Sequence, residues 1–187
     1  MTTQDNTKIQ DASQEASWID VSGLHKIYNT RAGGQTHALS DINFNVKKGE
    51  FISIVGPSGC GKTTLLNILA GLISKTEGSA KVSGHEVSKP LPEIGMVFQA
   101  PTLLPWRTIL ENVMVPVEIQ KLDKKAHLQK AKELLELAGL NGFEDKFPNQ
   151  VSGGMQRRAE VARAFINDPK IMLLDEPFRG LDHMTRG

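Results

Sequence analysis

Residues 56–64, with the sequence GPSGCGKTT, form a glycine-rich segment between two apolar stretches. The preceding residues 51–55 are β-rich and mostly apolar, which predicts a buried parallel strand, and residues 64–70 have the apolar spacing of a helix that ends before Gly71. A glycine-rich turn in this position lets consecutive backbone N–H groups at the helix N-terminus point at phosphate oxygens. The segment therefore predicts an α/β fold with a phosphate-binding loop.

The individual loop residues match the needs of a bound triphosphate. Lys62 supplies a positive charge for the β- and γ-phosphates, and the Thr63 hydroxyl is a ligand for Mg²⁺. A turn between two core elements would explain the glycines, but not a lysine followed by two threonines. The residues that we expect to contact the nucleotide are Gly56, Pro57, Ser58, Gly59, Cys60, Gly61, Lys62, Thr63 and Thr64.

Composition limits what kind of protein this is. The 187 residues suffice for one domain with a substantial core. With 22 basic and 21 acidic side chains, the chain lacks the positive field typical of nucleic-acid binding. One cysteine excludes an internal disulfide, and no apolar run approaches the ~18 residues that span a bilayer. Residues 1–17 are polar and predict a disordered lead-in, and a cytoplasmic, reducing location follows.

Periodicity gives an order of further elements. Strands are predicted at 18–21, 24–28, 79–83, 94–99 and 171–174, and a hairpin is predicted over 41–55. Thr108 and Glu111 have the spacing of a capping box, which predicts a helix that Pro116 limits in length. Two further helices are expected at 128–138, ending at Gly139, and at 155–167.

Two other segments carry chemistry. The sequence IMLLDEP is an apolar strand that ends in adjacent acids, so Asp175 can hold a metal ion while Glu176 orients or deprotonates water. A strand that ends in a solvated acidic turn is the alternative for this segment alone. Residues 151–158, VSGGMQRR, place a backbone N–H nest before a helix, although a flexible helix entry would have the same composition.

The motifs GPSGCGKTT, Gln99, VSGGMQRR, IMLLDEP and GLD at 180–182 occur in an order that resembles the ATP-binding subunit of ABC transporters. The resemblance extends from Trp18 to the last residue. It implies an ABC-type ATP-binding domain over residues 18–187, with a P-loop NTPase core, an N-terminal antiparallel β part and an inserted helical subdomain at about 100–168. ATP and Mg²⁺ are the implied cofactors.

The resemblance also implies roles for single residues. Tyr28 would stack on adenine, Gln99 would sense the γ-phosphate and Mg²⁺, and Asp182 would belong to a loop that communicates across a dimer. Ser152, Gly153 and Gly154 would contact ATP bound to the other subunit. Packing at a strand end remains an alternative for Tyr28, and capping of a strand for Gln99. The implied catalytic residues are Glu176, Gln99 and Lys62, and the implied metal ligands are Thr63, Gln99 and Asp175.

Partners follow from the same resemblance. Two subunits would sandwich ATP head to tail and drive transmembrane permease subunits, with a substrate-binding protein acting indirectly and no nucleic acid. The protein would then lie at the cytoplasmic face of the cell membrane as a peripheral subunit. Residues 103–113 and Met155 resemble importers of nitrate, sulfonates and taurine, which makes Trp106 either a permease contact or a packed loop aromatic.

Some features depart from the family pattern. Val151 and Met155 replace commoner signature residues, and Arg179-Gly180 stands where small residues usually precede Leu-Asp. The chain ends at Gly187, whereas the family continues to a strand that lies between the phosphate-loop strand and the acidic strand. We therefore expect a domain that is truncated at the C-terminus and lacks a central strand, at a cost of about 1 to 3 kcal/mol for each unsatisfied backbone group.

Three functions remain open at this point. The first is the ATPase of an ABC importer of small anions. The second is a truncated nucleotide-binding fragment without normal turnover. The third is a soluble, non-transport ABC ATPase, against which the near-neutral charge and the single domain argue.

Overall fold

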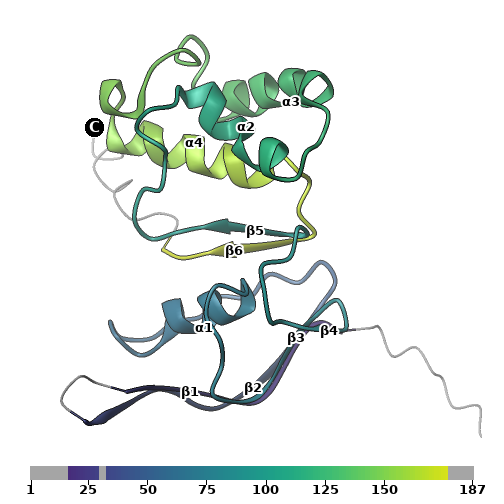
Figure 1. Cartoon of the computed structure of the whole chain (residues 1–187), viewed down its shortest axis with the longest axis vertical. Helices are drawn as coiled ribbons and strands as arrows, with labels where there is room; N and C mark the ends of the chain where they lie inside the picture. The colour runs from purple at the N-terminus through teal and green to yellow at the C-terminus, as the bar shows by residue number, and fades with distance from the viewer. Residues whose placement is uncertain (1–16, 30–32, 177–187) are drawn as a thin grey trace, which may run out of the picture.

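The computed structural model describes residues 17–29 and 33–176. The lead-in predicted at 1–17, apart from Ser17, and the proposed role of Asp182 lie outside the described residues. The described chain forms three layers (Figure 1). Three helices lie on one side of a pair of parallel strands, and an antiparallel sheet with a further helix lies on the other side.

The antiparallel sheet has the strand order β2-β1-β3-β4. Its strands are β1 (Ser17–Asn29), β2 (Gln35–Lys47), β3 (Glu77–Val82) and β4 (His85–Glu86). The two strands predicted at 18–21 and 24–28 form one continuous strand, whose pairing with β2 shifts in register between Val21 and Leu24. Both side chains are buried in the apolar cluster that also contains Ile68 of α1 (Lys62–Leu69).

The second sheet pairs β5 (Ile94–Val97) with β6 (Ile171–Leu174) in parallel. The register aligns Ile94 with Ile171 and Val97 with Leu174, so both strands end together. The predicted strands near 94–99 and 171–174 are therefore confirmed. Because the carboxyl ends of parallel strands lie at one edge, the residues that follow β5 and β6 are neighbours.

The helical layer consists of α2 (Ile109–Ile119), α3 (Lys124–Leu137), the short 3-10 helix η1 (Pro148–Gln150) and α4 (Gly153–Phe165). The capping box at Thr108 is confirmed. The prediction that Pro116 limits α2 is wrong, since the helix continues to Ile119. Val113 and Val117 are fully buried in the helical core, and this burial offsets the ~3 kcal/mol that an internal proline costs.

Residues 51–55 depart most from the sequence prediction. They are in neither a strand nor a helix, and Phe51 and Val55 are 86% and 90% exposed. The predicted buried strand and the hairpin over 41–55 are therefore wrong, because β2 pairs with β1 instead. A strand needs a partner for its backbone groups, and none of the described strands pairs with this segment.

An open groove of about 1080 Å³ lies beside this segment. Residues 47–54 line it together with residues 168–176, and apolar side chains of β1, β2 and α1, such as Ile19, Phe44 and Leu66, also line it. Residues 51–54 and the strand β6 both line this groove.

Candidate functional site

The phosphate-binding loop ends at the first residue of α1. Gly61 is the N-cap residue, with φ of 97°, and no side chain caps the helix. The first N–H groups of α1 are therefore not used by a capping side chain and remain suited to an anion. A β-carbon at Gly61 would lie 2.3 Å from the Ala38 carbonyl oxygen, so only glycine fits where the loop passes β2.

Lys62 is folded over the loop. Its ammonium group donates to the carbonyl oxygens of Gly56 at 2.7 Å and Pro57 at 2.8 Å, and it lies 3.6 Å from the Cys60 sulfur. These bonds hold the positive charge of Lys62 next to the backbone of the glycine-rich turn. A phosphate bound at the helix N-terminus would meet this charge without any movement of the helix.

The acidic pair follows β6. Asp175 is 4% exposed, and its backbone N–H donates to the Val97 carbonyl oxygen at 3.0 Å. Glu176 has a positive φ of 48°, which turns the chain away from the strand direction at this point. Lys62, Asp175 and Glu176 all line the open groove, so the structure brings the lysine and both acids to one space.

Gln99 comes to the acidic pair from β5. Its side-chain amide donates to a carboxylate oxygen of Glu176 at 3.0 Å, although 77 positions separate the two residues. A glutamine that only capped a strand would not need to contact the Glu176 side chain. Because the amide nitrogen is used by Glu176, the amide oxygen is the atom left for a metal ion or a water molecule.

The remaining predicted site residues lie elsewhere. Ser152 is the N-cap of α4, with its hydroxyl accepting from the Met155 N–H at 3.3 Å, and a β-carbon at Gly153 or Gly154 would meet open space. Tyr28 is 41% exposed near the end of β1, and Lys26 lies 4.9 Å from its ring centre. Neither Tyr28 nor residues 152–154 are among the described residues that line the open groove.

Sequence reasoning missed Arg157 and Glu160. Both are buried in α4, at 7% and 2% exposure. Arg157 binds the segments that carry Gln99 and Glu176, and Glu160 binds the segment that carries Gln99. Nothing in the periodicity of residues 155–167 distinguishes them from exposed charges of an amphipathic helix. The only available signal was their place just after the SGG motif.

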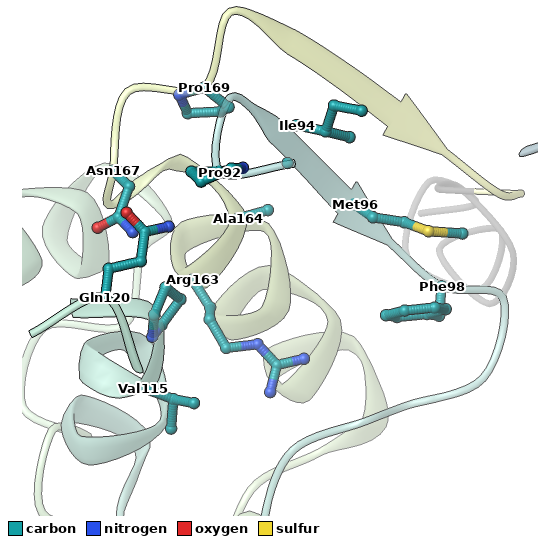
Figure 2. Close-up of a pocket in the computed structure, with 12 residues that line it drawn as sticks. Pro92, Ile94, Met96, Phe98, Val115, Gln120, Arg163, Ala164, Asn167 and Pro169 are labelled. Atoms are coloured by element: carbon teal, nitrogen blue, oxygen red, sulfur yellow. The ribbon is translucent and has the colours of Figure 1, made fainter. Parts of the chain in front are cut away.

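A second, smaller cavity of about 210 Å³ lies between β5, α2 and α4 (Figure 2). Apolar side chains such as Met96, Phe98 and Val115 line it, together with Gln120 and Arg163. The amide of Asn167 also lines it, and neither of its polar atoms has a hydrogen-bond partner among the described residues. The phosphate-binding loop and the acidic pair do not contribute to this cavity, so it is distinct from the open groove.

The described residues lack two kinds of feature. Within 17–29 and 33–176, no helix is long and apolar enough to cross a bilayer. The same residues contain no group of three or more His, Cys, Asp or Glu side chains that could hold a metal ion by themselves.

Comparison with known proteins then decides the family. A family model described as ABC transporter matches residues 39–179, which is more than half of the chain. The chain belongs to the ABC transporter ATP-binding family. The resemblance drawn from the sequence motifs is thereby confirmed.

Relatives of this ABC protein include import subunits. It is 47% identical over 163 residues to the taurine import ATP-binding protein TauB of Pelagibacter ubique, covering 87% of this chain and 62% of the relative. It is 41% identical over 172 residues to the nitrate import ATP-binding protein NrtC of Synechococcus elongatus, covering 91% of this chain and 26% of the relative. The chain thus spans less than two thirds of the length of these relatives.

A solved structure supports the fold class. The ATP-binding cassette MJ0796, in a dimeric post-hydrolysis state bound to ADP and Pi, superposes with a TM-score of 0.77 at 36% identity. The match covers 85% of this chain and 74% of that cassette. The α/β P-loop NTPase fold predicted from the sequence is therefore confirmed.

Proposed function

We propose that this ABC protein binds and hydrolyses ATP to power the import of small anions such as nitrate, sulfonates or taurine. The observation that carries the ATPase proposal is the 3.0 Å hydrogen bond between Gln99 and Glu176, next to a groove that Lys62 and Asp175 also line. A base, a water-positioning amide, a lysine and a metal-binding carboxylate are the parts that phosphoryl transfer to water requires. The family and the import relatives support the same proposal.

The residues present fit a Mg²⁺ ion shared with phosphates. The Thr63 hydroxyl, the Gln99 amide oxygen and the Asp175 carboxylate are hard oxygen donors, which Mg²⁺ prefers. When bound, the ion would neutralise charge on the phosphate oxygens. Lys62 would bind the same phosphates from above the loop, and Glu176 would accept a proton from the attacking water while Gln99 orients that water.

The same proposal includes a second ATP-binding subunit. Ser152, Gly153 and Gly154 form an open helix N-terminus that does not line the open groove, so they suit phosphate contacts made from outside the chain. We propose that they contact ATP held by the partner subunit and that Tyr28 stacks on adenine. The dimer reported for the MJ0796 cassette supports this arrangement.

Transmembrane permease subunits are the proposed membrane partners, with a substrate-binding protein acting through them. Trp106, which is 70% exposed just before α2, supports a contact on this side of the helical layer. The protein would then lie peripherally at the cytoplasmic face of the cell membrane. Loss of permease co-purification in a Trp106→Ala variant, with unchanged ATP affinity, is the expected result.

The Glu176→Gln variant tests the ATPase proposal. The amide cannot act as a base but has nearly the same shape, so turnover should fall by roughly 100-fold or more while binding of a fluorescent ATP analogue is retained. Glu136→Gln, the same change at an exposed position of α3, is the control and should leave turnover unchanged. Equal turnover in both variants would refute the role of Glu176.

A nucleotide-binding form without turnover is the second candidate, and one observation favours it. Residues 51–55 pair with none of the described strands and lie beside the open groove, so the loop that follows them is not supported by a sheet. This candidate predicts ATP binding in the unmodified chain without measurable hydrolysis. Release of phosphate by the unmodified chain would exclude it.

A further inference from the structure

Arg157 connects helix α4 to the ends of both parallel strands. Its guanidinium donates to the carbonyl oxygen of Phe98, which follows β5. It also donates to the carbonyl oxygens of Asp175 at 3.0 Å and Glu176 at 3.3 Å, which follow β6. One buried side chain therefore holds the residue before Gln99 and both members of the acidic pair.

Glu160 extends the connection to the other end of the Gln99 loop. One of its carboxylate oxygens lies 3.3 Å from the Arg157 guanidinium. The other accepts from the backbone N–H and, at 2.9 Å, from the hydroxyl of Thr102. Arg163, one turn further along α4, donates to the Thr102 carbonyl oxygen at 3.0 Å. The loop of residues 98–102 is thus bound to α4 at both of its ends.

The charges of this cluster are largely removed from water. Burial lowers the pKa of the Arg163 guanidinium, although the charge of Glu160 opposes that shift. A buried ion pair is a weak source of stability, because apolar side chains of similar volume often stabilise a fold as well or better. Stability alone therefore gives little reason for an arginine at position 157, whereas the geometry of its contacts gives a specific one.

We propose that Arg157 is a positioning residue, which sets the distance between Gln99 and Glu176 and ties it to the helix that begins with the SGG motif. The inference rests on the proposed function, since it assigns the Arg157 side chain a part in turnover. A planar guanidinium can donate to carbonyl groups of two segments at once, whereas the single ammonium of a lysine cannot hold the same fork. A displacement of α4 would then move both segments together.

Arg157→Lys is the test, because it keeps the charge and removes the fork. We expect kcat for ATP hydrolysis to fall roughly 10- to 100-fold, as for a catalytic group displaced by about 1 Å, while the Kd for ATP changes by less than about twofold. In a Gln99→Ala background the same substitution should have a smaller effect on kcat, because the part of its action that passes through Gln99 is already lost. A fall in kcat of the same size in that background would show that Arg157 does not act through Gln99.

Arg158→Lys is the matched control. Arg158 makes the same kind of bond one residue further on, but it donates to the Ala138 carbonyl oxygen at 2.7 Å, at the end of α3. Amide hydrogen exchange distinguishes the two variants without any need for turnover. Arg157→Lys should accelerate exchange in peptides that cover 98–102 and 171–176, and Arg158→Lys should leave those peptides unchanged.

The outcomes separate the two proposals. Unchanged exchange in both peptides of Arg157→Lys overturns the positioning role, whatever the activity. Absence of turnover in the unmodified chain overturns the hydrolysis proposal, while the exchange result still decides the role of Arg157. If Arg157→Lys does not fold, Glu160→Gln is measured in the same way, because it removes the charge beside the guanidinium and keeps an oxygen for Thr102.

Discussion

Asn112 organises the segment that leads into α2. The residue is fully buried, and its side-chain oxygen accepts from the Leu104 N–H at 2.7 Å. Its side-chain nitrogen lies 3.1 Å from the carbonyl oxygens of Leu104 and Arg107 and 2.9 Å from that of Thr108. All polar atoms of this side chain thus serve one turn, which also carries Trp106.

The substitution Asn112→Asp replaces the side-chain nitrogen, a hydrogen-bond donor, by an oxygen that, when ionised, can only accept. One carboxylate oxygen can still accept from Leu104, but the other replaces a donor and faces three carbonyl oxygens. The amide carries two N–H groups, so two hydrogen bonds are lost, and at about 0.5 to 1.5 kcal/mol each they give a loss of roughly 1 to 3 kcal/mol, before any repulsion. Against a total stability of about 5 to 15 kcal/mol, such a loss is large.

The loss should also depend on pH. The introduced carboxyl group is buried among acceptors, so its pKa in the folded state is raised above the ~3.9 of an unfolded aspartate. Because the folded state then holds its proton to higher pH than the unfolded state, the variant should lose stability as pH rises from about 4 through the raised pKa. The protonated form can donate one hydrogen bond, and the ionised form can donate none.

Urea unfolding, followed by tryptophan fluorescence at several pH values, measures this effect. Asn141→Asp is the control, since it makes the same change at an exposed position and should shift stability by less than about 0.5 kcal/mol. Equal losses in the two variants, or a deficit in Asn112→Asp that shrinks as pH rises, would refute the reasoning.

Two further predictions concern the loop and the sheet. Lys62→Ala removes charge-assisted bonds to phosphate worth about 1.5 to 3 kcal/mol, so titration should show roughly 10- to 100-fold weaker ATP binding, whereas Lys132→Ala on the exposed side of α3 should leave it unchanged. Unchanged affinity in Lys62→Ala would refute the phosphate-binding role. Gly78 and Gly49 both have positive φ, but a β-carbon at Gly78 would lie 2.0 Å from the Gly23 carbonyl oxygen and one at Gly49 would meet nothing within 4 Å. Thermal unfolding should therefore show a loss of about 1 to 2 kcal/mol for Gly49→Ala and a clearly larger one for Gly78→Ala, and equal losses would contradict the clash.

Local signals in the sequence were sufficient for several elements. The capping box at Thr108, the end of α3 before Gly139 and the acidic strand at 171–174 all occur as predicted, because each depends on residues within a few positions of one another. Pro116 shows the limit of such signals. Its local preference against a helix interior is overridden by burial of Val113 and Val117, which only the packing of α2 against α3 and α4 creates.

The glycine-rich loop itself, the lysine that follows it and the family were determined by the sequence alone, because the order and spacing of the motifs specify them. The tertiary structure decided three other properties. Residues 51–55 have the composition of a strand but pair with none of the described strands. Without such a partner they form no strand, and their side chains are largely exposed. The contact between Gln99 and Glu176 spans 77 positions and depends on the parallel register of β5 and β6. Arg157 supports both segments by donating to backbone carbonyl groups. Every residue has such a group, so nothing in the sequence indicates which ones Arg157 binds.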